Sequence, residues 1–439
     1  MSMLHIPASS EAEALVAAVV AVVSAGEKRA RARGPKGTEK LIAAVAAIVG
    51  GVLVEALRRD RLVFRSLQKA AFDGERIGYL QAKPVFGGLV AVGLLHRHQG
   101  IRFQETEHFA ETPSWSGMAA RFEATEDLLR LAREHGIDKD NVESCFTKVF
   151  PTKPPKVKHA VTLRSVPERH PGQKRVNSDG ELLPLDMEDN ATREIVAVVE
   201  QANAVFARHR FENCTPPALY RAFREDFTLG GRWITAGAAP IQQMSADDRL
   251  KITIDGQPVA EIDVKASQLS ILAAFAGMPC LGEADPYDFS DQLWARLPNA
   301  RDIVKAVVVA ALGAGRLPQR WPNKMKEKYG VPEELPVPVI TQALAARFPF
   351  LECPGEVLGV AQEQVALRLQ NLEAAALTAA LHALWRNDIP GVPVHDSILV
   401  PNDTVVVTMA ESELSRGYKE RCGGAEIRTV VERLAREGY

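Results

Sequence analysis

The sequence of 439 residues lacks the paired cysteines that disulfide-rich and zinc-binding proteins carry. Its cysteines are scattered and form no CxxC pair; they are Cys145, Cys214, Cys280, Cys353 and Cys422. We therefore expect reduced, mostly buried thiols in a reducing, cytoplasmic compartment. The N-terminus also lacks a basic segment followed by an apolar run and a cleavage site, so we predict no signal peptide.

An excess of charge of one sign is also missing. The formal net charge of −2 excludes a uniformly basic coat, so any contact with nucleic acid must come from local patches. Basic patches occur at residues 28–40, 153–175 and 301–328. In the first patch, Arg29, Arg31 and Arg33 are predicted to contact DNA phosphates. The alternative for each patch is a solvated surface without a partner.

Long apolar runs are scarce. One segment, residues 41–57, approaches the ~20 apolar residues that span a bilayer. It is rich in alanine, contains Gly50 and Gly51, and is interrupted by Glu55. These features favour a buried helix over a membrane span, and we expect no membrane partner.

The composition is that of a folded protein with more than one domain. Hydrophobic residues make up 46% of the chain, and single cores stop growing near ~250 residues. Shifts in composition predict an N-terminal domain (1–150), a connector rich in proline and lysine (151–188), a helical segment (189–227) and a C-terminal domain (228–439). One helix of the third segment is expected over residues 189–210, because its apolar residues recur at spacings of three and four.

The N-terminal domain is predicted to be mainly helical. Ala/Val-rich helices are expected over residues 11–24 and 38–59, and an apolar helix ends at Gly93. A short β-ribbon follows, and residues 112–137 return to helix. Helices followed by a ribbon and flanked by arginines indicate a winged-helix DNA-binding module. A helical accessory domain without DNA contact is an equally good interpretation.

The C-terminal domain mixes strands and helices, so the fold class is α+β. Two strands surround the Asp255–Gly256 turn, and helices are predicted over residues 266–277, 299–316 and 367–388. Asp263 lies where the second of these strands gives way to a helix. Asp396 interrupts the apolar run GVPVHDSILV, either within a strand or at the tip of a hairpin.

A buried aspartate is costly unless a cation or hydrogen-bond donors compensate its charge. The alternative for His-Asp-Ser is a simple turn, because aspartate and serine favour turns. Arg301 and Lys305 are four residues apart on one predicted helix, and the nearest acid, Asp302, is expected to face elsewhere. A strand-ending aspartate, a cationic helix face and a second aspartate at a hairpin form the arrangement needed for two-metal nucleotidyl transfer.

Three motifs in this order resemble the single-subunit polymerases, which include family A DNA polymerases and phage-type RNA polymerases. EIDVKASQLSILAAFAG is similar to the first palm motif, DYSQIELRILAHLSG, without a gap from Asp263 to Gly277. RDIVKAVVVAALGAGR resembles the fingers helix RxxxKxxxFGxxYG, and VPVHDSILVP resembles the last palm motif, VHDE or HDS. With the segments GGRW and DPY between them, the resemblance covers residues 228–401. Its layout is similar to compact polymerase-like proteins of phages, plasmids and mobile elements.

The resemblance implies a right-hand polymerase, with a palm, reduced fingers and a thumb-like segment at 189–227. It implies that Asp263 and Asp396 are catalytic ligands of two Mg²⁺ ions, for which Mn²⁺ can substitute. The expected contacts of the dNTP or NTP are Arg301, Lys305, Gln268 and Val309. The expected contacts of the DNA (or RNA) primer and template are His395, Arg232 and Arg249. Gln268 stands in the place of the family residue that senses the sugar of the nucleotide.

Several residues depart from the family pattern. Val309 and Gly313 replace the aromatic residues of the fingers helix, and Ser397 replaces the glutamate of the DNA enzymes. DNA synthesis is favoured because the first motif follows the DNA-polymerase pattern more closely. An RNA polymerase or primase of the same superfamily is the second reading. A third is a replication initiator that binds DNA through its N-terminal basic module without catalysis.

Overall fold

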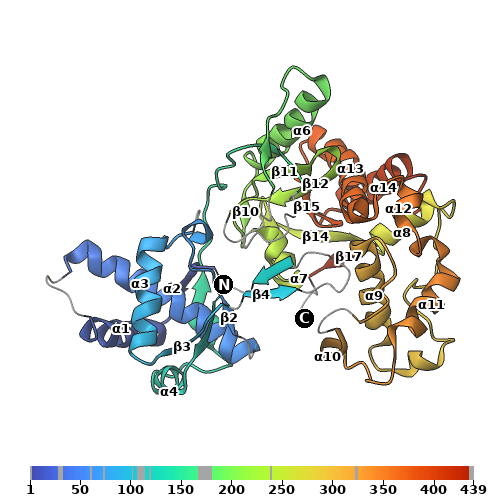
Figure 1. Cartoon of the computed structure of the whole chain (residues 1–439). Coiled ribbons are helices and arrows are strands. Elements are labelled where there is room, and N and C mark those ends of the chain that lie inside the picture. Colours follow the sequence, from blue (N-terminus) through green and yellow to red (C-terminus); the bar gives the residue numbers. More distant parts are fainter. Residues whose placement is uncertain are drawn as a thin grey trace.

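The computed structural model describes residues 2–27, 33–59, 62–72, 75–100, 102–105, 114–117, 120–166, 180–237, 240–321 and 325–434. Arg29 and Arg31 of the first basic patch lie outside these ranges. Buried apolar residues form two separate clusters, one with members from Met3 to Phe146 and the other with members from Val161 to Ala425. We call the described residues 2–148 the N-terminal unit and residues 161–434 the C-terminal unit (Figure 1).

The N-terminal unit packs helices against a small antiparallel sheet. Its longer helices are α1 (Ser10–Ala25), α2 (Pro35–Arg59) and α3 (Tyr79–Ala91), and the sheet order is β2 (Val63–Phe64), β6 (Arg121–Ala124), β3 (Leu95–His98). Outside this sheet, β1 (His5–Pro7) pairs with β7 (Phe146–Lys148), which follows α5 (Val142–Cys145), and β4 (Arg102–Glu105) pairs with β5 (Ser114–Gly117).

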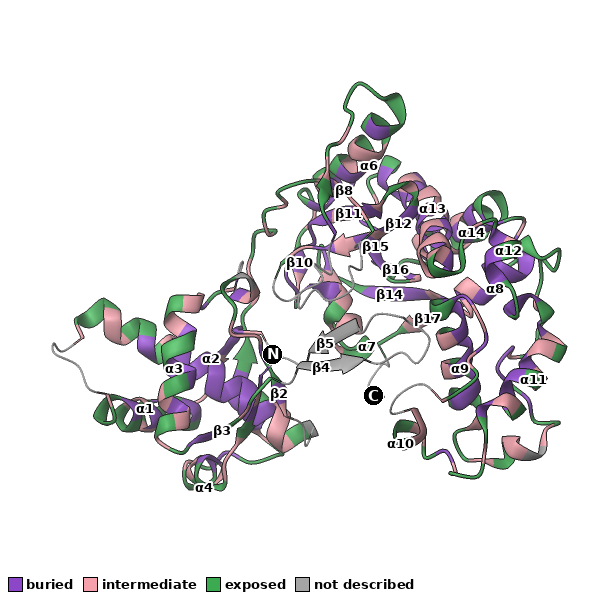
Figure 2. Ribbon diagram, viewed as in Figure 1, coloured by how far each residue is buried: buried purple, intermediate pink, exposed green. Residues whose placement is uncertain are grey.

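Helix α2 is the centre of this unit. It is the one helix of the described chain that is long and apolar enough to cross a membrane, and 67% of its most apolar window is buried inside the structure. Ala44, Ala47 and Ile48 are fully buried, in agreement with the predicted buried helix. Much of α2 is coloured as buried in Figure 2. At Gly50 a Cβ atom would lie 2.5 Å from the ring of Phe146, so only glycine permits this close approach.

The prediction of a helix over residues 112–137 is wrong for its first half. This part contains β5 and β6, and helix α4 spans only Glu126–Glu134. Within β6 the buried Phe122 alternates with the exposed Glu123, which is the period of a strand. The Thr125 side chain accepts a hydrogen bond from the Leu128 N–H and thereby sets the start of α4.

The C-terminal unit is built on a mixed arrangement of helices and two sheets. The larger sheet has the order β10 (Phe211–Glu212), β13 (Thr253–Ile254), β14 (Gln257–Val264), β16 (Ser397–Pro401), β15 (Val392–Val394), and β17 (Thr429–Arg433) also pairs with β14. The second sheet has the order β12 (Asp226–Thr235), β11 (Leu219–Arg224), β8 (Val161–Arg164), β9 (Leu182–Leu183). The mixed fold class predicted from the sequence is therefore observed, with small, largely antiparallel sheets.

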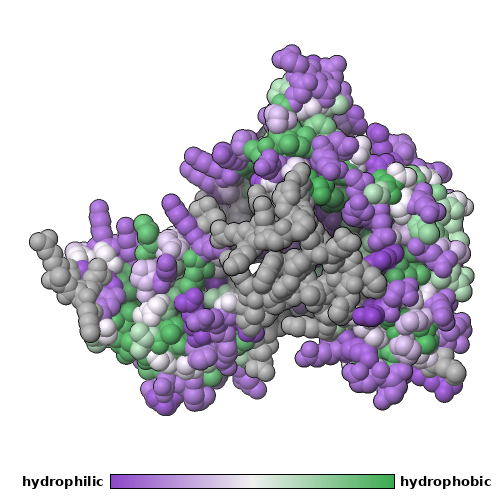
Figure 3. All heavy atoms as spheres, in the orientation of Figure 1, coloured by the Kyte–Doolittle hydropathy of each residue, from purple (hydrophilic) through white to green (hydrophobic). Residues whose placement is uncertain are grey.

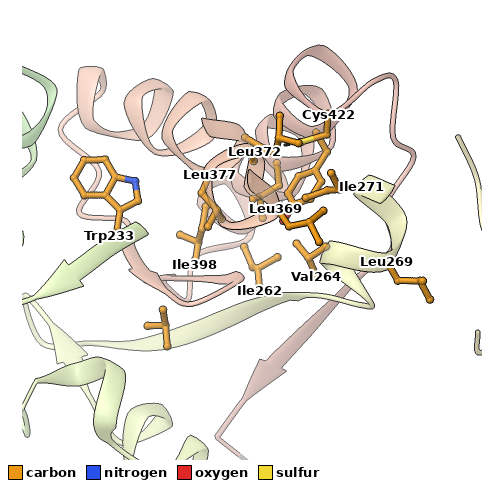
Figure 4. Packing of buried hydrophobic residues seen from close by; sticks show 14 of the residues in the cluster. Trp233, Ile262, Val264, Leu269, Ile271, Leu369, Leu372, Leu377, Ile398 and Cys422 are labelled. Atoms are coloured by element: carbon orange, nitrogen blue, oxygen red, sulfur yellow. Dashed lines mark hydrogen bonds between the residues drawn. The ribbon is translucent and has the colours of Figure 1, made fainter. Parts of the chain in front are cut away.

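Helices cover one face of the larger sheet. They are α8 (Ser267–Phe275), α13 (Val365–Arg386) and α14 (Thr404–Arg421) (Figure 1). Two further helices, α9 (Ala300–Ala314) and α12 (Pro354–Leu358), contact α8 and α13. Helices α10 (Met325–Tyr329) and α11 (Val337–Arg347) contact α9. Ile262 and Val264 point from β14 toward Leu369 and Leu372 of α13, as Figure 4 shows. A Cβ at Gly417 of α14 would lie 2.5 Å from the Ala376 carbonyl of α13, so the two helices pack in close contact.

The segment 189–227 was expected to be helical, but the structure forms a helix only in its first half. Helix α6 spans Asn190–Phe206, ends before the predicted residue 210, and is followed by β10 and β11. The Asp189 side chain accepts a hydrogen bond from the Thr192 N–H and sets the predicted start of the helix. On the face seen in Figure 3, hydrophilic residues gather around α6.

Candidate active site

Asp263 and Asp396 are brought together by two neighbouring strands. In the register of β14 and β16, Asp263 lies opposite Ser397, the residue that follows Asp396. Side chains alternate along β14, so Ile262 and Val264 enter the helical core while Glu261 and Asp263 lie on the other face. Asp263, which was predicted to lie where this strand gives way to a helix, therefore points away from the helical core.

Asp396 lies at the tip of the hairpin between β15 and β16, one of the two placements that the sequence allowed. His395, its neighbour in the turn, has a left-handed backbone with φ of 55°. Non-glycine residues rarely adopt this conformation, and such strain is common at functional sites. Burial, followed by the negative charges of Glu373 and Asp263, raises the pKa of Asp396 to about 6.

Glu373 of α13 is a third carboxylate at this place. Its side chain is almost fully buried; Oε2 accepts from Arg232 Nη2 at 2.8 Å, and Oε1 accepts from the Ser267 hydroxyl at 2.6 Å. The Tyr418 hydroxyl lies 2.8 Å from Ser267 Oγ and extends this buried network. Sequence reasoning missed Glu373. The available signal was an acidic residue on the otherwise apolar face of a predicted helix.

The donor set fits a magnesium ion better than a metal held wholly by protein. In the described residues, no three His, Cys, Asp or Glu side chains are grouped so as to hold a metal by themselves. Mg²⁺ commonly binds through one or two carboxylates and completes its octahedron with water and substrate phosphates. The two half-buried carboxylates Asp263 and Asp396 meet that requirement, and a cation would compensate the like charges that raise the pKa of Asp396.

These acids line a pocket with a volume of about 960 Å³. Helix α9 forms another part of its wall, to which Arg301 and Lys305 contribute one helical turn apart, as the sequence spacing predicted. Its acids are Asp263, Asp285, Glu373 and Asp396, and its cations are Arg232, Lys265, Arg301, Lys305 and Arg428. The pocket thus combines metal-binding oxygens with cationic groups suited to a polyanion.

Arg301 is not free of acidic neighbours, contrary to expectation. Its Nε lies 2.5 Å from Asp285 Oδ2, and its Nη1 lies 3.8 Å from Asp302 Oδ1. The hydrogen bond from the Tyr287 N–H and the guanidinium of Arg301 hold the pKa of Asp285 below its usual value, against the effect of burial. Lys305, by contrast, forms no ion pair with a described residue. Of the two predicted phosphate contacts, Lys305 is the one available without rearrangement.

The predicted sugar and nucleotide contacts also line the pocket. Gln268 Nε2 lies 3.5 Å from Glu373 Oε2, so the same buried carboxylate positions it. Val309 is 58% exposed, and a Cβ at Gly313 would meet nothing within 4 Å. The wall therefore has open space where the resembling family has aromatic rings.

The residues predicted to contact primer and template fall in different places. Arg232 of β12 lines the pocket through its ion pair with Glu373. His395 is exposed, and its Nε2 lies 3.2 Å from the Gln242 carbonyl oxygen. Of the three arginines predicted to contact DNA in the first basic patch, Arg33 is the one that the structure describes, and it forms an ion pair with Glu27.

Arg249 was expected to contact primer or template phosphates, but the fold uses it internally. Its Nε and Nη2 donate to the two carboxylate oxygens of Glu261, each at 2.8 Å. Ser397, the residue that differs from the DNA enzymes, donates from its buried hydroxyl to Glu261 Oε1 at 2.7 Å. Arg249 and Ser397 therefore stabilise, through Glu261, the strands β14 and β16 next to Asp263 and Asp396. A bidentate partner on another strand cannot be deduced from residue spacing alone.

The chain matches no protein-family model. It also matches no curated protein sequence. A solved structure to which it is similar is the POL domain of Pol1 from M. smegmatis in complex with DNA primer-template and dNTP. The sequences are 12% identical, the TM-score is 0.32, and the match covers 55% of this chain and about half (52%) of that chain. This likeness is too low to establish a shared fold, so the function proposed below rests on the pocket residues.

Proposed function

We propose that the chain is a nucleic-acid polymerase that adds nucleotides to a 3′-hydroxyl and releases pyrophosphate, with DNA synthesis favoured. The observation that carries the proposal is a single pocket lined by Asp263 and Asp396 from the strands and by Arg301 and Lys305 from α9. The order and spacing of the three motifs support it independently. In this assignment the larger sheet with α8, α13 and α14 is the palm, and α9 to α11 form reduced fingers.

Each side chain has a task that follows from its position. Asp263 and Asp396 would hold two magnesium ions, which when bound supply the Lewis acidity for activating the primer hydroxyl and stabilising the leaving pyrophosphate. Lys305 binds the triphosphate as a point charge, and Arg301 joins it by exchanging Asp285 for a phosphate oxygen. Glu373 keeps Arg232 and Gln268 oriented toward the nucleotide and the primer end.

An RNA polymerase or primase is the second candidate. The open wall at Val309 and Gly313 favours it, because the aromatic residues of the family's fingers helix are missing there. Ser397 does not bear on the choice of sugar, since its hydroxyl is bound to Glu261 and to the Val394 carbonyl oxygen.

The test is an extension assay with a primed template, labelled dNTPs or NTPs, and Mg²⁺ or Mn²⁺. Incorporation of dNTPs supports the first candidate, and incorporation of NTPs supports the second. No incorporation of either nucleotide with either ion contradicts both candidates. The outcome also decides whether a DNA-binding initiator without catalysis is the better interpretation. For that reading, Asp263→Ala and Asp396→Ala would leave the cellular function unchanged.

We also propose that the N-terminal unit is a winged-helix-like module that binds DNA. The support is its sheet order, β2-β6-β3, with α3 directly before β3 and exposed cations at Lys83 and Arg97. Neutralising Arg29, Arg31 and Arg33 is expected to weaken DNA binding and to flatten its dependence on salt. An unchanged salt slope would exclude these arginines from the interface.

A further inference from the structure

Lys265 places a positive charge directly on one of the candidate metal ligands. Its Nζ lies 2.6 Å from Asp263 Oδ2, and the two side chains are 39% and 30% exposed. Its backbone N–H donates to the Arg428 carbonyl oxygen at 2.9 Å, so the chain leading into β17 holds the base of this lysine in place. The ammonium group therefore lies in the pocket at the point where β14 ends.

The negative charges of Asp263, Glu373 and Asp396 are compensated unequally by the protein's own cations. Glu373 has Arg232 as its ion-pair partner, and Asp263 has Lys265. Asp396, by contrast, forms no ion pair with any residue of the described chain. The protein thus supplies one cation to each of two acids and leaves a deficit of positive charge at the third.

A divalent ion shared by Asp263 and Asp396 would remove that deficit, but it would meet the ammonium of Lys265. Two cations a few ångströms apart in a half-buried pocket repel each other, and Oδ2 of Asp263 already accepts a hydrogen bond from the lysine. A lysine side chain is a point charge on a flexible stem, so it can withdraw without moving the strand.

We propose that Lys265 is a built-in counter-cation of the three neighbouring acids Asp263, Glu373 and Asp396. It holds Asp263 while no divalent ion is bound and thereby lowers the affinity of the empty pocket for that ion. The inference rests on the proposed function, because it takes Asp263 and Asp396 as the metal ligands. Its consequence is that the pocket is loaded efficiently only when a substrate's phosphates arrive with the ion and attract the displaced ammonium group.

The test is Mn²⁺ binding to the full chain without nucleotide or nucleic acid, measured from the electron paramagnetic resonance signal of free Mn²⁺. Lys265→Met is expected to bind the ion about three- to tenfold more tightly than the wild type, and Lys265→Arg about equally. Lys265→Gln is the second neutral variant, in case the methionine perturbs folding. Lys251→Met is the matched control, since Lys251 pairs with Asp248 outside the pocket and its loss should not change binding.

Unchanged or weaker Mn²⁺ binding by both neutral variants would overturn the inference, as would equally tight binding by Lys265→Arg and Lys265→Met. The extension assay separates this failure from that of the proposed function. If the wild type extends primers while the neutral variants show no gain in Mn²⁺ affinity, only the role of Lys265 is lost. If Asp263→Asn binds Mn²⁺ as well as the wild type, the metal assignment of Asp263 fails, and this inference fails with it.

Discussion

Two regions of the molecule, the Arg65–Glu75 pair of the N-terminal unit and the pocket of the C-terminal unit, bury charge in opposite ways. In the N-terminal unit, Glu75 is fully paired: its Oε1 accepts from Arg65 at 2.8 Å, and its Oε2 accepts from the Met3 N–H at 2.9 Å. In the C-terminal unit, Asp263, Glu373 and Asp396 interact at one pocket, and the pKa of Asp396 is raised to about 6. A closed pair stabilises a fold, whereas a group of like charges costs stability and is retained where a ligand compensates it. The difference favours the C-terminal unit as the place of the proposed ligand site.

The largest expected effect on activity comes from removing the charge of Asp263 or Asp396 in the pocket. Asp263→Asn or Asp396→Asn should lower primer extension at least about a hundredfold, because each removes a charged ligand at the site of chemistry. Asp127→Asn, at an exposed acid of the N-terminal unit, is the control and should retain full activity. Extension by the two pocket variants at the wild-type rate would show that the charge difference between the units is unrelated to catalysis.

The next effect concerns stability in the N-terminal unit. Glu75→Gln should destabilise it by about 3–5 kcal/mol, because the buried Arg65 then loses its ion pair with the Glu75 carboxylate. Denaturation by guanidinium, followed by circular dichroism, measures the loss. The double variant Arg65→Met with Glu75→Gln should recover part of it. A Glu75→Gln variant as stable as the wild type would mean that this pair is not a stabilising one.

Removing the half-buried Asp396 from the C-terminal unit should instead raise the free energy of unfolding. Asp396→Asn is expected to stabilise the metal-free chain by up to about 3 kcal/mol near pH 7.5. The folded pKa lies above the unfolded value of about 3.9, so the folded state loses stability as pH rises from about 4 to 6. The gap between variant and wild type should grow over that window and stay constant above it. Unfolding curves in chelator at several pH values would show it, and a gap independent of pH would contradict it.

The smallest expected effects on stability concern residues with a positive φ, one in each unit. The N-terminal unit uses glycine at Gly93 (φ of 78°), whereas the pocket has Ala266 (φ of 53°) at the start of α8. Gly93→Ala should destabilise the chain by about 1 kcal/mol, and Ala266→Gly should stabilise it by about 0.5 kcal/mol. Melting temperatures of the two variants provide the measurement. Shifts of the same sign would show that the pocket stores no strain at Ala266.

The residues that sequence reasoning predicted correctly are those whose position depends on local periodicity. Asp263 at the end of a strand, and Arg301 and Lys305 one turn apart, follow from the spacings of strands and helices. The strand pair around Asp255–Gly256 follows from its turn residues. The metal and nucleotide roles of these side chains stay predictions until the extension assay is done.

The residues that sequence reasoning missed depend on contacts between distant segments. Glu373 becomes part of the site because α13 packs beside α8. Arg249 is withdrawn from the pocket because Glu261 of β14 accepts both of its hydrogen bonds, and the Ser397 hydroxyl donates to the same carboxylate. No local pattern encodes these partners. The helix predicted over residues 112–137 failed for a related reason: pairing with β2 and β3 outweighs the helical tendency of a short segment that contains alanine and glutamate.

The pairing of β17 with β14 has a consequence for biosynthesis. Thr429 lies opposite Val264, next to Asp263, so the wall formed by Arg428, Thr429 and Val430 exists only after almost the whole described chain has been made. The N-terminal unit, whose core ends at Phe146, can fold on the ribosome long before that point. A polypeptide interrupted before residue 428 would possess both aspartates and the cationic helix, yet it would be released with its pocket open on one side.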